Sequence, residues 1–286
     1  MSWTQTATRW DGLVSLAVLH EGQRLAEIGD PNCDVAIASL TKPLVAMTTL
    51  MAHEEGSIDL DRAIEIAVFD SCRCTPRRGV TPRMLLAHAS GLATDTFDWR
   101  YPPLTRRVYS NSGYQLLGAH FLAVVGMSLD TYFSEGIAQP LGLTHTAIGA
   151  NPASSATTTV HEFGQIMCAL MPSCHNGRRL LAPTTLCDAF AVQFGSLRGI
   201  VPGFGAYDPN LWGLGFEIKG TKSPHWMAPS APPATVGHFG QLGSYFWMDP
   251  QRQFGVVALG REPFGRWAHS LWPLLNEELL EAFIGS

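Results

Sequence analysis

The chain has 286 residues, of which 46% are hydrophobic and 15% charged, and its formal net charge at pH 7 is -5. The hydrophobic fraction is close to the average of globular proteins, so we expect a sizeable core and exclude a wholly disordered chain. The acidic excess argues against nucleic acid as the main partner, because phosphate binding needs clustered positive charge. Most basic residues are arginines, and the lysines are only Lys42, Lys219 and Lys222.

The predicted elements of the amino-terminal part are a hairpin and a helix. Residues 13–19 and 24–28 are apolar stretches separated by a short polar segment, which predicts a β-hairpin. A stretch of helical composition then runs to Glu55. Proline is tolerated in a helix only within the first turn, so Pro43 places the start of this helix close to Ser39.

The middle of the chain is mainly helical and its last third returns to strands. Helices are predicted at 82–88, 112–125, 129–138, 158–170 and 183–194. Residues 196–210 are rich in Gly and Pro and indicate a boundary. Strands are predicted at 212–218, 235–239, 244–249 and 254–259, followed by a helix at 266–284. Residues 223–234 contain four prolines and predict an extended loop.

This order of elements predicts an α+β fold in which the two ends of the chain share one sheet. The length suits one large domain or two lobes. We expect a sheet lobe made of residues 1–38 and 200–286, and a mainly helical lobe made of residues 39–199.

Two further features bear on the compartment. The most apolar run, 116–125, is interrupted by His120 and is shorter than the ~20 residues that span a bilayer, and residues 1–12 lack the pattern of a secretory signal. The six cysteines are too sparse for a disulfide scaffold, and the spacing of Cys72 and Cys74 does not match a zinc knuckle. We expect a cytoplasmic protein with reduced, mostly buried thiols, no metal and no membrane partner.

Ser39 and Lys42 are the first candidates for chemistry. Their spacing places both side chains on one face of the predicted helix. A serine hydroxyl becomes a good nucleophile only when a neighbour takes its proton, and a lysine can do so if its pKa falls below the usual ~10.4. The S-x-x-K pattern alone also arises by chance, so a surface pair at a helix start is the alternative interpretation.

Other short segments accompany this pair. Tyr109-Ser110-Asn111 precedes an apolar helix, where Asn111 can cap the helix while Tyr109 lies at its mouth. Gly237-His238-Phe239-Gly240 ends a strand and begins a turn, where a glycine permits close backbone approach to a ligand.

Taken in order, the motifs S-x-x-K, L-L-x-H-x-S-G-L, Y-S-N, P-L-G-L, W-G-L-G and H-x-G resemble the serine β-lactamase-like family. The resemblance is to the branch with class C β-lactamases, D-stereospecific peptidases and carboxylesterases, and it covers residues 12–262. It implies an antiparallel sheet flanked by helices, with the active site between the sheet and the helical lobe.

The resemblance also implies roles for individual residues. Ser39 would be the acylated nucleophile, and Lys42 and Tyr109 would share general-base and general-acid work, with the resting base left open. Asn111 would bind a substrate carbonyl, and His238 and Gly240 would line the site. The backbone N–H groups of Ser39 and Gln241 would form the oxyanion hole. His88, in the second motif, is expected to brace the fold only. No cofactor is required.

The chain departs from the β-lactamase pattern at His238-Phe239-Gly240, where β-lactamases usually have Lys-Thr-Gly. A neutral histidine and a phenylalanine offer neither the cation nor the hydroxyl that bind a substrate carboxylate. The sequence therefore favours an intracellular serine hydrolase acting on a small ester or amide, most of all a small carboxylic ester. The alternatives are a D-amino-acid peptidase or weak β-lactamase, and a non-catalytic binding protein of the same fold. The oligomeric state stays open.

Overall fold

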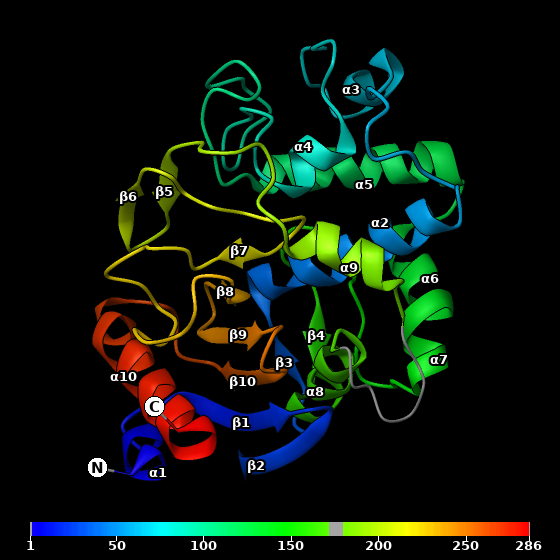
Figure 1. The fold of residues 1–286 in the computed structure, drawn as a ribbon. Helices are drawn as coiled ribbons and strands as arrows, with labels where there is room; N and C mark the ends of the chain where they lie inside the picture. Colours follow the sequence, from blue (N-terminus) through cyan, green and yellow to red (C-terminus); the bar gives the residue numbers. More distant parts are fainter. Residues whose placement is uncertain (1, 172–179, 286) are drawn as a thin grey trace.

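The two ends of the chain meet in one six-stranded antiparallel sheet (Figure 1). The computed structural model describes residues 2–171 and 180–285. The strand order is β2-β1-β10-β9-β8-β7. The strands are β1 (Leu13–His20), β2 (Gln23–Gly29), β7 (Glu217–Ile218), β8 (Val236–Gly240), β9 (Ser244–Asp249) and β10 (Phe254–Gly260). The prediction of an α+β fold with a shared antiparallel sheet is confirmed.

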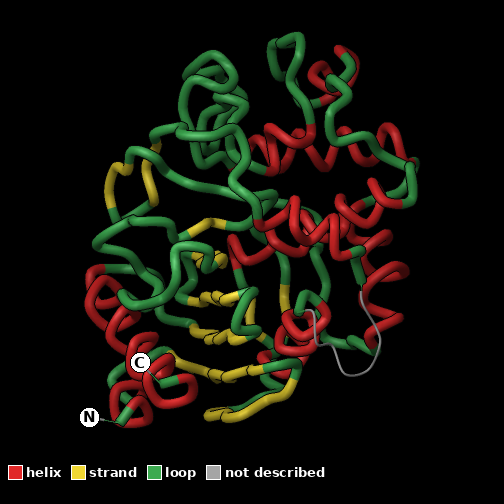
Figure 2. The backbone as a smooth tube through the Cα atoms, viewed as in Figure 1, coloured by secondary structure: helices red, strands yellow, loops and turns green. Residues whose placement is uncertain are grey.

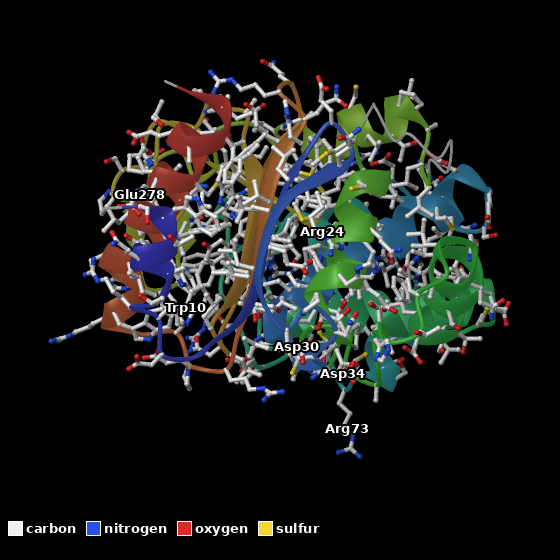
Figure 3. All side chains as sticks on the ribbon, turned by 90° about the horizontal axis from the view of Figure 1, so that it is seen from below. Trp10, Arg24, Asp30, Asp34, Arg73 and Glu278 are labelled. Atoms are coloured by element: carbon white, nitrogen blue, oxygen red, sulfur yellow. The ribbon has the colours of Figure 1, made fainter. Side chains whose placement is uncertain are left out.

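The central strands are buried on both faces, because helices cover each side of the sheet. Along β9, Tyr245 and Trp247 belong to the apolar cluster under α10 (Arg266–Ile284), and Phe246 and Met248 belong to the cluster on the opposite face. This is the alternation expected of a strand between two layers. Seen from below, Trp10 lies on the α10 side of the sheet (Figure 3), and α1 (Trp3–Ala7) packs against α10.

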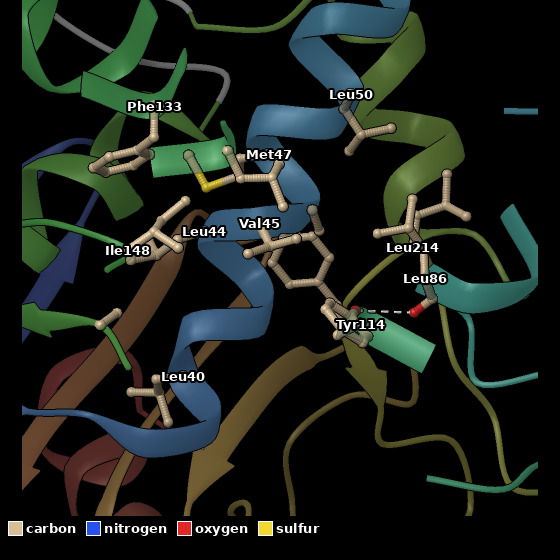
Figure 4. Packing of buried hydrophobic residues seen from close by; sticks show 14 of the residues in the cluster. Leu40, Leu44, Val45, Met47, Leu50, Leu86, Tyr114, Phe133, Ile148 and Leu214 are labelled. Atoms are coloured by element: carbon tan, nitrogen blue, oxygen red, sulfur yellow. Dashed lines mark hydrogen bonds between the residues drawn. The ribbon is translucent and has the colours of Figure 1, made fainter. Parts of the chain in front are cut away.

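On that opposite face, helix α2 (Thr41–Glu54) runs through the interior of the molecule. It follows a short 3-10 turn, Ala38–Leu40, and all its residues from Thr41 to Ala52 are buried. Leu44, Val45 and Met47 project from it into the surrounding apolar cluster (Figure 4). A helix that is apolar on all sides must be buried on all sides, and this packing holds its first turn in one place.

The remaining helices contribute residues to the same apolar cluster as α2. They are α3 (Ile66–Ser71), α4 (Pro82–Leu86), α5 (Asn111–Val125), α6 (Leu129–Phe133) with a π-helical turn (Ser134–Ala138), α7 (Gln139–Leu141), α8 (Val160–Ala169) and α9 (Pro183–Phe190). Residues 87–110, all described, form loops between α4 and α5 (Figure 2). A short pair, β3 (Val35–Ala36) and β4 (Thr157–Thr158), leads to the 3-10 turn. The predicted helices are confirmed in order, although α1, α3 and α7 were not predicted.

The strand predicted at 212–218 is wrong for most of its length. Only Glu217–Ile218 forms β7, because the preceding residues use their backbone groups elsewhere. The N–H of Gly213 donates to Phe216, and the N–H of Leu214 donates to Ala189 at the end of α9. The expected boundary at 196–210 also contains a small hairpin, made of β5 (Gly199–Val201) and β6 (Gly205–Tyr207).

The Pro-rich segment 223–234 packs into the fold instead of extending as a free loop. Trp226, Met227 and Ala228 are completely buried in the cluster beneath α10. The side-chain amide of Asn276 on α10 donates to the carbonyl of Trp226 at 3.0 Å. The apolar residues between the prolines therefore decide the position of this segment.

The cysteines and apolar helices add two observations. Of the five cysteines in the described part, only Cys74 is buried, so the expectation of mostly buried thiols is wrong; Cys174 lies outside the described residues. Among the described helices, none is long and apolar enough by itself to cross a membrane. Only the bent pair Asn111–Val125 and Leu129–Leu141, at 75° to each other, reaches that length and composition together.

Candidate active site

Ser39 lies at the start of the buried helix, and its position is set by the residues around it. Ala38 has a φ of +44°, which is uncommon for a residue other than glycine. The hydroxyl of Thr41 donates to the carbonyl of Ala38 at 2.6 Å and accepts the N–H of Ala156 at 2.9 Å. The turn that carries Ser39 is therefore tied to α2 and to a second segment of the chain, while the Ser39 side chain stays partly exposed.

The amine of Lys42 lies among three oxygen atoms. Its Nζ is 3.1 Å from the Oγ of Ser39, 2.7 Å from the Oδ1 of Asn111 and 2.8 Å from the carbonyl of Ala153. The two carbonyl oxygens can only accept, so they take two N–H bonds from the amine. In the neutral amine, the remaining lone pair can then accept the hydroxyl proton of Ser39.

Burial makes the neutral form of Lys42 accessible. It lowers the pKa of Lys42 to about 7, and the negative charge of Asp95 opposes this shift only in part. Desolvation penalises the ammonium, and among the contacts of the described residues no carboxylate touches Nζ to offset that penalty. Lys42 can therefore exchange a proton near neutral pH.

Asn111 contributes its side chain to the site, and Ser110 caps the helix. The Oγ of Ser110 accepts the N–H of Gly113 at 2.8 Å, so the prediction that Asn111 caps α5 is wrong. The amide of Asn111 instead accepts from Lys42 and donates its Nδ2 to Asp95 at 2.7 Å. These two contacts define which way the amide points, and Asp95 was not predicted as part of the site.

Tyr109 completes the group around the hydroxyl. The Nζ of Lys42 lies 4.8 Å from the centre of its ring. Burial raises the pKa of Tyr109 well above its usual value, although a hydrogen bond with Ser39 acts in the opposite direction. The phenol therefore keeps its proton at neutral pH. The structure brings together Ser39, Lys42, Tyr109 and Asn111, as the sequence predicts.

His238 faces the same group from strand β8. Its ring centre is 5.9 Å from that of Tyr109 and 5.6 Å from that of Trp212. The Nδ1 of His238 is 2.8 Å from the carbonyl of Phe239, which can only accept, so Nδ1 carries the proton. Burial and the charge of Lys42 lower the pKa of His238 to about 3, so this imidazole is neutral.

Phe239 and Gly240, the two residues that follow His238, lie against different parts of the molecule. The ring of Phe239 points to the opposite face of the sheet, with its centre 5.0 Å from that of Phe264 and 5.8 Å from that of Trp272. A Cβ at Gly240 would lie 2.4 Å from the carbonyl of Ile37, so this glycine permits close approach to the segment before Ser39, whereas the sequence suggested approach to a ligand.

Gln241 begins the turn from β8 to β9. Its backbone carbonyl accepts the N–H of Phe264 at 2.9 Å, and its side-chain amide donates to the carbonyl of Phe264 at 3.3 Å. Gly240 lies against the residues before Ser39, so the N–H of Gln241 remains a candidate donor to an oxyanion.

A buried arginine holds the loops around the site. The guanidinium of Arg107 donates to the carbonyls of Ala87, Gln193 and Asn210, which belong to three separate segments. Burial lowers the pKa of Arg107 to about 10. No sequence signal identifies this role, because its partners are backbone carbonyls far away in the chain.

The described residues also contain cavities away from this group. One of about 710 Å³ lies between α5, the start of α6 and residues 149–152, and no predicted site residue lines it. In the described part of the chain, no three His, Cys, Asp or Glu side chains lie close enough together to hold a metal ion.

A serine, a buried lysine and a tyrosine grouped beside an antiparallel sheet form the arrangement expected of the serine β-lactamase-like class. The family model named Beta-lactamase matches residues 13–269, and the chain belongs to this family. The structure of a β-lactamase from Mycobacterium bovis has a TM-score of 0.88 and 36% identity, and the match covers 98% of each chain.

Two further relatives widen the comparison. A protein of Salmonella enteritidis that bears the name D-alanyl-D-alanine carboxypeptidase is 28% identical over 205 residues, which are 57% of this chain and 47% of that protein. The chain thus matches about half the length of this curated relative. A penicillin-binding protein homologue from Caulobacter crescentus has a TM-score of 0.77 at 18% identity over 98% of this chain and 95% of that chain, and it shares the fold.

Proposed function

We propose that this protein is a serine hydrolase that cleaves small carboxylic esters through an acyl-enzyme on Ser39. The observation that carries the proposal is the position of the Lys42 amine, 3.1 Å from the Ser39 hydroxyl with two carbonyl oxygens occupying its N–H groups. Family membership and the relatives support a serine hydrolase kind of function.

In the first half-reaction, the neutral amine of Lys42 takes the proton of Ser39, and Oγ forms a bond to the ester carbonyl carbon. The negative charge moves to the carbonyl oxygen, which accepts from the N–H groups of Ser39 and Gln241. Such donors typically contribute about 3 kcal/mol to transition-state stabilisation. The bond to the alcohol oxygen then breaks while Tyr109 gives that oxygen its proton, and Tyr109 regains a proton from Lys42.

In the second half-reaction, water replaces the alcohol. Lys42 accepts one proton of the water as the water oxygen attacks the acyl carbon, and Tyr109 stays protonated. The bond to Ser39 breaks, Oγ regains its proton, and the carboxylic acid leaves. The net change is ester plus water to acid plus alcohol, so the proposed mechanism uses only groups of this chain and solvent.

The preference for neutral acyl groups follows from the β8 side of the site. Burial lowers the pKa of His238 to about 3, so this histidine supplies no positive charge to a substrate carboxylate. The ring of Phe239 packs on the opposite face and offers no hydroxyl. Both residues therefore favour esters without a carboxylate near the scissile bond.

The test is labelling with a fluorophosphonate probe together with hydrolysis of short p-nitrophenyl esters. We expect the wild type to label at one residue, identified as Ser39 by peptide mapping, and to show a burst of p-nitrophenol. Ser39→Ala should lose both signals, and the exposed Ser196→Ala should keep them. A folded wild type that takes no label would contradict catalysis and leave a binding protein of this fold.

The relatives favour a second candidate within the same chemistry. The Mycobacterium bovis structure is described as a β-lactamase and the Salmonella enteritidis protein is named for D-alanyl-D-alanine. If nitrocefin or D-alanyl amides turn over faster than the ester series, the second candidate replaces the ester preference, while the acyl-enzyme on Ser39 stands.

A further inference from the structure

His88 holds the backbone on both sides of Tyr109. The carbonyl of His88 accepts the N–H of Val108 at 3.0 Å, and its ring Nδ1 accepts the N–H of Ser110 at 3.1 Å. Tyr109 is therefore flanked by two hydrogen bonds to a single residue. Neither bond involves the phenol itself, so His88 acts on the position of the backbone that carries it.

The ring of His88 also contacts the ring of Tyr109. The two ring centres are 4.6 Å apart, and the ring of Trp212 lies nearly perpendicular to that of His88, with the ring centres 4.7 Å apart. His88 follows α4 with a φ of +55°, and its N–H bonds to Leu85 at 3.1 Å. The end of a helix therefore fixes the backbone of His88, and the imidazole transmits that position to Tyr109.

Packing alone does not account for an imidazole at this place. Nδ1 accepts a backbone N–H, so the ring proton is on Nε2. His88 is 1% exposed, and its Nε2 has no hydrogen-bond partner among the residues that the structure describes. A buried donor without a partner is unfavourable, and a phenyl ring of similar shape would avoid it. The feature that phenylalanine lacks is the acceptor for Ser110.

We propose that His88 is a positioning residue, whose ring acceptor and carbonyl together set the phenol of Tyr109 against Ser39 for proton delivery to the leaving group. This inference rests on the proposed function, in which Tyr109 protonates the departing alcohol. It gives a chemical role to a residue that the sequence assigned to bracing the fold.

Two substitutions separate the acceptor from the ring. His88→Asn keeps an acceptor near the position of Nδ1 and tolerates a positive φ, but it loses the ring. His88→Phe keeps the ring and loses the acceptor. If the acceptor matters, His88→Asn is more active than His88→Phe. If the ring of His88 serves only for packing, His88→Phe is more active than His88→Asn.

The leaving group supplies a readout that a purely structural role would not change. An alkyl alcohol leaves only when it is protonated, whereas p-nitrophenolate leaves without a proton. We expect His88→Phe to lower kcat on ethyl esters about 10- to 100-fold, the range for a misplaced catalytic group, and to affect p-nitrophenyl esters much less. KM should change little, and His88→Asn should stay within about threefold of wild type.

Thermal unfolding of each variant establishes that it is folded. If His88→Phe does not fold, His88→Ala replaces it, and His88→Asn must then exceed it on ethyl esters by the same factor. Equal losses on both ester types, or activity of His88→Phe at the wild-type level, would overturn the inference while Ser39 still labels. A wild type without labelling would overturn the proposed function, and this inference with it.

Discussion

Lys42 and Lys222, two of the three buried lysines of this fold, differ in their surroundings. Lys42 contacts neutral oxygens of Ser39, Asn111 and Ala153. Lys222 lies 2.9 Å from the carboxylate of Glu217 and also donates to backbone carbonyls. Burial lowers the pKa of both amines, but only Lys222 has a carboxylate in direct contact that opposes the shift.

The cluster around Lys222 is closed and complete. Glu217 also accepts the Nε2 proton of His225 at 3.0 Å and the indole N–H of Trp226 at 2.9 Å. Burial by itself would raise the pKa of Glu217, but the charges of Lys222 and His225 and these hydrogen bonds outweigh it and hold that pKa well below its usual range. The carboxylate stays charged, and the cluster pins residues 222–226 to β7.

The comparison shows how the partner decides what a buried lysine can do. A carboxylate in contact keeps the ammonium charged and makes a structural pin. Carbonyl oxygens satisfy the N–H groups without stabilising the extra proton as strongly, so the amine can act as a base. The surroundings of Lys42 are also partly open to solvent at Ser39, whereas the cluster around Lys222 is closed to solvent.

The largest expected effect comes from Lys42→Arg. Arginine preserves the positive charge but does not lose its proton, so it cannot accept the proton of Ser39. We expect the acylation rate, measured with the fluorophosphonate probe, to fall by about 10³-fold or more, similar to the loss of a nucleophile-activating base. The control is Lys219→Arg, at the remaining lysine, which should label at the wild-type rate. Comparable loss in both variants would contradict the assignment of the base.

Lys222→Met should affect stability instead of rate. It leaves the Glu217 carboxylate buried with one cationic partner fewer, and removing one member of a buried ion pair costs about 3–5 kcal/mol. We expect the urea midpoint to fall accordingly, while the labelling rate of the folded protein stays within about threefold of wild type.

Glu217→Gln combined with Lys222→Met tests the same cluster from the other side. It removes the unpaired charge, so it should recover part of the lost stability. A double variant that is less stable than Lys222→Met would contradict the view that the uncompensated carboxylate causes the loss.

The sequence could predict that the main residues of the candidate site lie together, because their signals are local. Ser39 and Lys42 are one helical turn apart, and Tyr109 and Asn111 flank one helix start. The order of the short motifs gave the family resemblance that implied the fold. Ser110 and Asn111 are both good caps, so propensity could not decide between them; the contact of Asn111 with Lys42 shows why Ser110 takes that role.

The parts that were missed depend on distant partners. Arg107 donates to carbonyls of residues 20 to 103 positions away, and backbone acceptors leave no mark in a sequence. The role of His88 depends on which nitrogen meets Ser110, which only coordinates reveal. In the Pro-rich segment, composition predicted an extended loop, but the burial of Trp226 outweighs it.

Asp95→Asn gives the smallest and most specific effect. Since acylation in the proposed mechanism needs neutral Lys42, whose pKa burial lowers to about 7, the wild-type rate should fall about tenfold per pH unit below that value and level off above it. The charge of Asp95 favours the ammonium, so its removal should lower the pKa of Lys42 further and move the acidic limb to lower pH. At pH 6 the variant should label faster than wild type, by less than about tenfold and most clearly at low salt, because Asp95 is exposed.

The control is Asp98→Asn, on the same loop. It removes an equal charge that bonds to Thr96 instead of Asn111, and it should leave the acidic limb of the pH–rate profile in place. If the acidic limb moves to higher pH in Asp95→Asn, or moves equally in both variants, the Asp95 carboxylate does not set the pKa of Lys42.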